Sequence, residues 1–206
     1  EHHLNIIDTP GYDDFQGQVL AALAAVDGAI LVINGASGVE VGTLKVWKFV
    51  DSFKLPVVAV INRLDKENVD FDKCVASFSE GLSIKAVPVI LPIGLSQNFE
   101  GVIDLLNLKA LFYRKDSSGK FEAKDIPASS KEFVLKAREK LIEAIAESND
   151  ALLEKYLGGG ELSLEEIYQG FKVAVRERKI IPVAAASAAL NIGLQPLLDL
   201  IVAAMP

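Results

Sequence analysis

The sequence lacks several features that would assign it to particular classes of protein. Its single cysteine, Cys74, cannot form a disulfide within the chain, and such sparing use of cysteine fits a reducing compartment. No apolar run reaches the roughly 18 residues that a membrane-spanning helix needs. Nor does the sequence contain a charged and then apolar leader with a small-residue cleavage site. We therefore expect a cytoplasmic protein that has no membrane partner.

Positive charge is also scarce. The 21 Lys and Arg residues are outnumbered by 28 Asp and Glu residues, which gives a formal net charge of −7. This balance argues against a surface that binds nucleic acid mainly through its phosphates. With 206 residues, of which half are hydrophobic, the chain is long enough to form one or two domains with buried cores.

The most informative stretch lies near the start, where an apolar run at residues 4–7 is followed by Asp8-Thr9-Pro10-Gly11. An apolar run that ends in turn residues is typical of a buried strand. Ligands of parallel α/β sheets bind beyond the carboxyl ends of the strands, so Asp8 would meet a ligand there and Gly11 would let the backbone approach it. A plain strand-to-helix turn is the alternative. Because the chain opens inside a strand, we expect it to be a fragment.

Apolar strands alternate with helical segments along the first half of the chain. Strands are expected at residues 29–33, 56–61 and 86–92, with helices at about 19–26, 39–53 and 71–81. Uninterrupted apolar strands separated by helices are typical of a parallel sheet that is covered on both faces. The sequence therefore predicts an α/β fold.

The middle of the chain predicts an inserted α+β subdomain at residues 96–179. A turn at residues 116–119 indicates a hairpin, and three helices are expected at about 130–148, 149–157 and 163–178. The last of these begins with a capping-box pattern, Ser163 with Glu166. The charged faces of these helices fit a solvated surface, with a partner surface as the alternative.

The chain then returns to its first pattern, with a strand at about 180–186 and a helix at about 194–204. We therefore expect one interrupted domain, made of residues 1–95 and 180–206, around the insert at 96–179.

Three polar signatures follow three of the expected strands. They are Asp8 to Gly11, Asn62-Arg63-Leu64-Asp65, and Ser187-Ala188. In order and context they resemble the GTPase domain of the translation factors, most closely the elongation factor G group, and the resemblance covers essentially the whole chain. Residues 99–104, 152–157 and 194–199 also look like parts of that group's insert and closing helix. The resemblance implies a P-loop GTPase-type sheet, mostly parallel with helices on both faces, which binds GTP or GDP with Mg²⁺ and switches conformation on the ribosome.

The second and third signatures are suited to recognising guanine. Guanine presents an N1–H and an N2–H₂ as adjacent donors, and one ionised carboxylate, here Asp65, can accept from both. Asn62 would brace the loop and meet the base edge, and Arg63 would stack on the base where the family usually has Lys. Backbone N–H groups of Ser187 and Ala188 would meet the guanine oxygen. Each signature taken alone also fits a plain strand-end turn.

The first signature would serve the phosphates. By resemblance, Asp8 holds Mg²⁺ through water, and the Gly11 N–H meets the γ-phosphate. Tyr12 occupies the catalytic position where elongation factor G has a His that orients the attacking water. A phenol with a pKa of about 10 is a poor substitute for an imidazole with a pKa of about 6.5. The sequence therefore does not decide whether the protein hydrolyses GTP.

No phosphate-binding motif of the form G-x-x-x-x-G-K-[ST] occurs in the sequence. We expect it upstream of Glu1 in a longer protein, and we expect the chain alone to be inactive and monomeric. Two other functions are compatible with the sequence. One is a non-catalytic module whose insert binds a ribosomal stalk protein, and the other is a GTPase that binds nucleotide without turnover.

Overall fold

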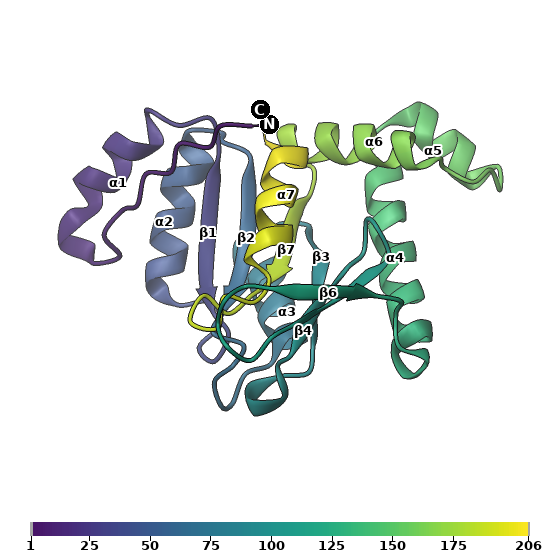
Figure 1. The fold of residues 1–206 in the computed structure, drawn as a ribbon. Coiled ribbons are helices and arrows are strands. Elements are labelled where there is room, and N and C mark those ends of the chain that lie inside the picture. Colours follow the sequence, from purple (N-terminus) through teal and green to yellow (C-terminus); the bar gives the residue numbers. More distant parts are fainter. Residues whose placement is uncertain (1, 206) are drawn as a thin grey trace.

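In the part of the chain that the structure describes, residues 2–205, seven strands form one sheet in the order β1-β2-β7-β3-β4-β5-β6 (Figure 1). The structure is a computed structural model. Four neighbouring strands are parallel: β1 (Ala29–Asn34), β2 (Val57–Asn62), β7 (Ile181–Ala185) and β3 (Ala86–Ile93). Three more continue the sheet antiparallel: β4 (Gly101–Asp104), β5 (Lys109–Tyr113) and β6 (Phe121–Lys124). The predicted α/β fold is confirmed.

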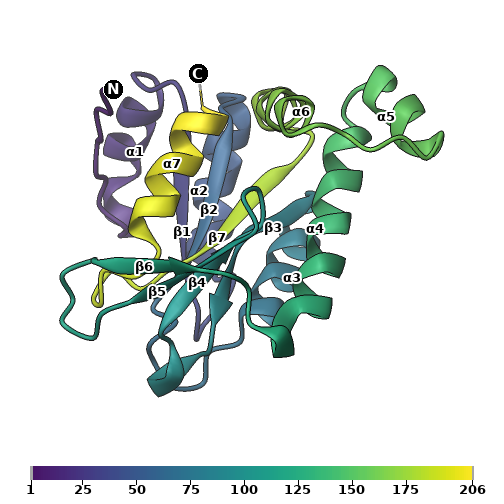
Figure 2. The ribbon, with the colours of Figure 1, turned by 45° about the vertical axis from the view of Figure 1, so that its right-hand side comes forward.

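Helices cover both faces of the inner parallel strands, whereas one face of β1 is open, with Ile30 and Val32 at 40% and 59% exposed. Residues 57–61 of β2 are each no more than 4% exposed. In Figure 1, α7 (Leu194–Ala204) lies in front of β2 and β7, whereas α2 (Val41–Ser52) and α3 (Phe71–Leu82) lie behind the sheet. Figure 2 shows the same layers from a second direction. This arrangement leaves the carboxyl ends of the parallel strands at one edge of the molecule, where their loops meet.

The insert adds strands to this sheet rather than forming a sheet of its own, since β4 pairs with β3. Its helices are α4 (Lys131–Ala146), α5 (Asp150–Leu157) and α6 (Leu164–Arg176). The predicted capping box is confirmed, because the Glu166 N–H donates to Ser163 Oγ at 3.2 Å and the Ser163 N–H donates to Glu166 Oε2 at 2.7 Å. Helix α4 packs against β3 and α6 packs against α7, so the insert contacts the rest of the fold along two lines. The division at residues 96 and 180 stays a prediction.

The remaining elements are short. They are the 3₁₀ turns η1 (Asp13–Phe15), η2 (Ser96–Asn98) and η3 (Ala128–Ser130), and the helix α1 (Gln16–Leu23). None of the helices within residues 2–205 combines the length and the apolarity that a membrane span requires.

The strand predicted at residues 4–7 is wrong. Residues 2–11 form no regular structure, and the side chains of Ile6 and Ile7 are 71% and 53% exposed. A strand is stable when another strand satisfies its backbone groups. Here β1 lies at the edge of the sheet and pairs with β2, and the opening segment runs past α1 instead (Figure 1). An apolar run alone therefore does not determine strand pairing.

Candidate functional site

The carboxyl ends of β2 and β7 bring two loops of the chain together. The two strands run side by side, with Ile61 opposite Ala185. We call the segments that follow them, residues 62–66 and 186–192, the strand-end loops. The backbone joins them directly, since the Ala186 N–H donates to the Ile61 carbonyl at 3.0 Å and the Leu64 N–H donates to the Ala186 carbonyl at 3.3 Å. Parallel strand ends thus place the second and third predicted signatures in contact.

Asn62 ties the two strand-end loops together through its side chain. Its Oδ1 accepts from the Arg63 N–H at 2.8 Å and from the Ala188 N–H at 2.9 Å. This geometry is compatible with the bracing role predicted for Asn62, and its role at a base stays a prediction. The backbone of Arg63 is left-handed, with φ of 65°, which is uncommon for a residue other than glycine. The Arg63 side chain lies exposed beside the loops.

Asp65 and Ser187 form the closest side-chain contact between the loops. Ser187 Oγ donates to Asp65 Oδ1 at 2.6 Å and accepts from the Leu190 N–H at 3.2 Å. Ser187 is fully buried, so its hydroxyl has a fixed orientation toward the carboxylate. Burial by itself raises the pKa of Asp65, but the hydrogen bonds from Ser187 and Lys66 outweigh it and the pKa lies below its ordinary value. Asp65 is therefore an ionised acceptor at neutral pH.

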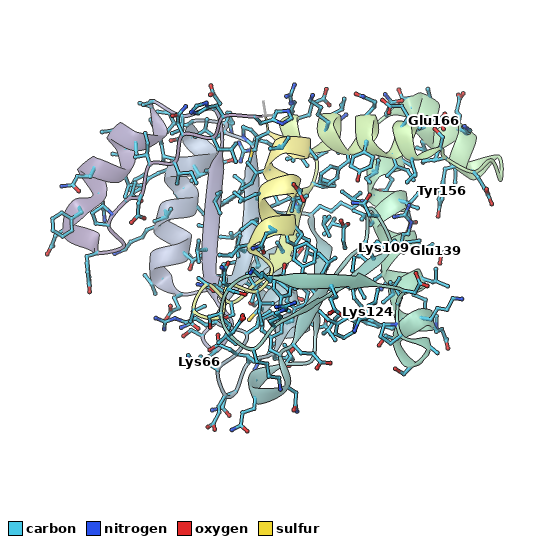
Figure 3. All side chains as sticks on the ribbon, in the orientation of Figure 1. Lys66, Lys109, Lys124, Glu139, Tyr156 and Glu166 are labelled. Atoms are coloured by element: carbon cyan, nitrogen blue, oxygen red, sulfur yellow. The ribbon has the colours of Figure 1, made fainter. Side chains whose placement is uncertain are left out.

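Lys66 was not anticipated from the sequence, yet it contacts the same carboxylate. Its Nζ lies 3.0 Å from Asp65 Oδ2, and the side chains of Lys66 and Asp65 are 61% and 8% exposed. Figure 3 shows Lys66 at the edge of the molecule below the sheet, far from Glu166 and Tyr156 of the insert. A basic residue directly after the Asn-Arg-Leu-Asp motif is the signal that could have revealed it.

Leu64 is a second residue that sequence reasoning missed. It is the apolar member of the Asn-Arg-Leu-Asp motif, and its side chain is fully buried. Its carbonyl accepts from the Ser96 N–H at 2.8 Å, which connects the loop to η2. Leu64 thus anchors the polar loop in the core.

The backbone N–H groups predicted to meet the guanine oxygen already donate within the protein. The Ser187 N–H bonds the Ile192 carbonyl at 3.0 Å, and the Ala188 N–H bonds Asn62. A ligand oxygen would therefore share the Ala188 N–H with Asn62 or displace it.

The structure does not bring the phosphate-side residues to this place. Asp8, Gly11 and Tyr12 lie on the irregular opening segment, and Tyr12 is 78% exposed. Within residues 2–205 no group of three or more His, Cys, Asp or Glu side chains is arranged to hold a metal ion. Of the groups predicted to bind a nucleotide, the strand-end loops thus bring together those assigned to the base. The roles of Asp8, Gly11 and Tyr12 stay predictions.

Comparison with known proteins identifies the family. The whole sequence, residues 1–206, matches the elongation factor Tu GTP binding domain. The chain belongs to this family. It is 40% identical over 205 residues to elongation factor G of Thermotoga maritima and 38% identical to elongation factor G of Thermotoga neapolitana. Both matches cover 100% of this chain and 30% of the relative.

A solved structure supports the same assignment. A crystal structure of a protein from Thermus thermophilus has a TM-score of 0.88 and 35% identity to this chain, and the match covers 97% of this chain and 29% of the other. The predicted resemblance to the GTPase domains of translation factors, in the elongation factor G group, is thus confirmed. The chain spans about 30% of the length of the elongation factors G that it matches.

Proposed function

We propose that the strand-end loops form the guanine-recognition half of a GTP and GDP site in a translational GTPase similar to elongation factor G. The observation that supports this most strongly is the arrangement around Asp65. A carboxylate has about four lone-pair sites, and Ser187 and Lys66 take one on each oxygen. One acceptor site on each oxygen is left for the N1–H and N2–H₂ donors of guanine.

This arrangement also explains how other bases would be rejected. Adenine offers an acceptor at N1, which would face the ionised Asp65 without a proton between them. A buried polar group left unpaired in this way costs about 1–3 kcal/mol, and more where the group is charged. Asp65 has a side chain that is 8% exposed, so water would compensate little of that cost.

We propose that the full-length protein, rather than this chain alone, hydrolyses GTP. The phosphate-binding motif is absent from this sequence, and Asp8 is one exposed carboxylate. A bound Mg²⁺ would neutralise charge on the phosphates. Asp8 would contribute to holding it through water, Gly11 would bind the γ-phosphate, and Tyr12 would orient the attacking water.

We further propose that the full-length protein acts as a cytoplasmic monomer on the ribosome, because its relatives are elongation factors G. A ribosomal stalk protein is a proposed partner of the insert. The support is the charged, exposed surface of α4, which also carries the exposed side chains of Phe133 and Leu135, 56% and 48% exposed.

The experiment that tests the guanine site is nucleotide binding by the Asp65→Asn variant of the full-length protein. We expect that variant to lose affinity for GTP and to gain affinity for xanthosine triphosphate, whose altered base edge accepts where guanine donates.

A further inference from the structure

The hairpin turn of the insert lies directly against the loop that carries Ser187. The turn joins β5 to β6 and includes Gly119, and in both Figure 1 and Figure 2 it lies beside the loop that enters α7. A Cβ atom at Gly119 would lie 2.5 Å from Gln195 Nε2 and 2.6 Å from Asn191 Nδ2. Real Cβ atoms do not approach other atoms so closely, and the φ of Gly119 is 73°. The backbone conformation therefore favours glycine here, and a Cβ would displace the side-chain ends of Gln195 and Asn191.

Tyr113 provides a second link, between the hairpin and the start of α7, which directly follows the loop. Its hydroxyl donates to Gln195 Oε1 of α7 at 3.2 Å, across 82 positions of the sequence. Burial raises the pKa of Tyr113 to about 12, so the phenol keeps its proton and remains a donor. Gln195 is thus contacted by the insert from two sides, through Tyr113 and Gly119.

The contacted loop is the one that positions the guanine-recognition groups. Ser187 and Ile192 exchange two backbone hydrogen bonds of 3.0 Å, which closes the loop immediately before Gly193 and α7. A Cβ at Gly193 would lie 2.5 Å from the Ala185 carbonyl oxygen and 3.4 Å from Val102 Cγ1 of β4. The loop therefore has little freedom to move away from the insert.

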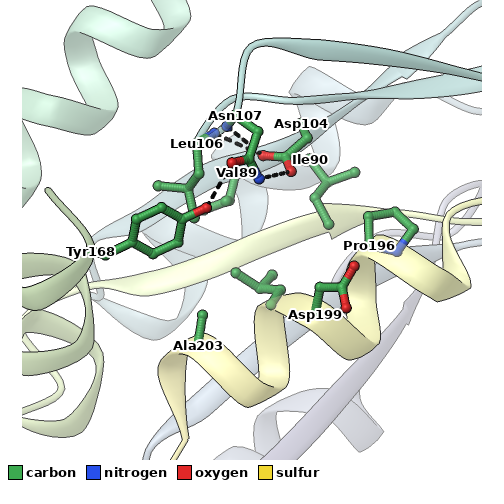
Figure 4. A pocket seen from close by; sticks show the side chains of 10 residues that line it. Val89, Ile90, Asp104, Leu106, Asn107, Tyr168, Pro196, Asp199 and Ala203 are labelled. Atoms are coloured by element: carbon green, nitrogen blue, oxygen red, sulfur yellow. Dashed lines mark hydrogen bonds between the residues drawn. The ribbon is translucent and has the colours of Figure 1, made fainter. Parts of the chain in front are cut away.

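The insert also faces the next turns of α7 across a small cleft. This cleft, of about 40 Å³, lies between the turn after β4 and the helices α6 and α7. Figure 4 shows Tyr168 bonded to Asn107 on one side of this cleft and Asp199 on the other. This volume is enough for water but far below the few hundred Å³ of a small-molecule pocket. The cleft is thus a seam between the insert and α7 rather than a ligand site.

We propose that the β5–β6 hairpin of the insert positions the Ser187 loop, through Gly119 and Tyr113, and thereby slows the release of guanine nucleotide. The proposal rests on the proposed function of the strand-end loops. Gly119 and Tyr113 are positioning residues, because they contact Asn191 and Gln195 rather than the nucleotide. The insert would then control nucleotide exchange through contacts between segments that are distant in the sequence.

The test is the release of fluorescently labelled GDP from the full-length protein, measured by rapid mixing. We expect Gly119→Ala to speed release by about five- to tenfold, in the usual range of coupling between two sites. Its matched control is Gly159→Ala, because Gly159 also lies in the insert with a φ of 77° but has no atom within 4 Å of the added Cβ. That control carries the same backbone strain without displacing Gln195 or Asn191, and we expect its release rate to be unchanged.

A second variant keeps the proposal testable if Gly119→Ala folds poorly. Tyr113→Phe removes one hydroxyl and keeps the ring, so we expect release to be about threefold faster, as the loss of one hydrogen bond predicts. The affinity ratio of GDP to inosine diphosphate, which lacks the 2-amino group, should also fall in both variants. A contact that only stabilises the fold would lower the thermal midpoint and leave this ratio unchanged.

The outcomes separate the two proposals. The role of the hairpin would be overturned if Gly119→Ala and Tyr113→Phe released GDP at the same rate as Gly159→Ala, with the same affinity ratio of GDP to inosine diphosphate. Even then, the proposed function would stand if Asp65→Asn lost its preference for guanine in the same assay. If the unmodified protein shows no preference for guanine over inosine or adenine nucleotides, the proposed function itself fails.

Discussion

The hydroxyl of Ser187 donates a 2.6 Å hydrogen bond to the carboxylate of Asp65, across 122 positions of the sequence. This bond joins the ends of two neighbouring parallel strands and fixes the acidic group that we propose recognises guanine. Because the bond stabilises the charged form of Asp65, it contributes to the lowered pKa of that carboxyl.

Ser187→Ala in the full-length protein should raise the pKa of Asp65 toward its ordinary value of about 3.9. A lowered pKa contributes stability that is present above the ordinary pKa and is lost as pH falls through the lowered folded value. The variant should therefore lose GDP affinity at a higher pH than the unmodified protein, and bind about tenfold more weakly at neutral pH. Titrating GDP affinity against pH checks both effects.

Ser52→Ala is the control, since it removes a hydroxyl bonded to the Phe49 carbonyl at the end of α2. Equal pH profiles for the two variants would contradict the role of Ser187.

Lys66→Met should strengthen GDP binding by about two- to fivefold, the range of a partly exposed ion pair. Lys66 Nζ lies 3.0 Å from Asp65 Oδ2 and leaves the second acceptor site of that oxygen for guanine, but its positive charge makes the carboxylate a weaker acceptor. The variant should also show a smaller salt dependence of affinity, because the ion pair that it removes is screened by salt. Calorimetry at low and high salt measures both. Weaker binding by Lys66→Met would mean that Lys66 supports the site instead.

Tyr12→His should raise ribosome-stimulated GTP turnover of the full-length protein by about tenfold or more. An imidazole titrates near neutral pH and can orient and deprotonate water, whereas a phenol cannot do so efficiently. Tyr12→Phe is the control, and its turnover should not rise above that of the unmodified protein, because a phenyl ring cannot hydrogen-bond water. A flat or lower rate for Tyr12→His would show that Tyr12 does not occupy the water-positioning site.

Ser163→Ala should lower the free energy of unfolding by about 1 kcal/mol, because it removes the hydrogen-bonded cap of α6. Ser130→Ala is its matched control, since Ser130 is the N-cap residue of α4 but makes no side-chain cap hydrogen bond. Urea denaturation of both variants gives the comparison. Similar losses in the two would indicate that the capping hydrogen bond of Ser163 contributes little.

Much of the fold could be predicted because apolar runs and caps are local signals. The helix expected at about 194–204 matches α7 (Leu194–Ala204), and the strand expected at 29–33 matches β1 to within one residue. The meeting of Asn62 with Ala188 also followed from sequence, since parallel strands of one sheet end at the same edge.

The features that sequence reasoning did not reach depend on contacts that no local pattern encodes. Residues 4–7 have the composition of a strand, but within the described chain no strand pairs with them, and Ile6 is 71% exposed. The contact of Gly119 with Gln195 joins residues that are distant in sequence, and a glycine in a turn does not reveal what it touches. The pairing of β4 with β3, which extends the main sheet into the insert, was not predicted either.

The measurement that tests the account most directly is the base preference of the full-length protein with Asp65→Asn. An amide at this position offers a donor as well as an acceptor, so it suits the xanthine edge and leaves one guanine donor unpaired. We expect GTP affinity to fall by about tenfold or more and xanthosine triphosphate affinity to rise. Asp70→Asn is the control, because it removes an equal charge from a nearby position while an amide can still cap α3. A reversal of preference in Asp65→Asn alone is the predicted result, and an unchanged affinity for GTP would contradict the assignment of Asp65.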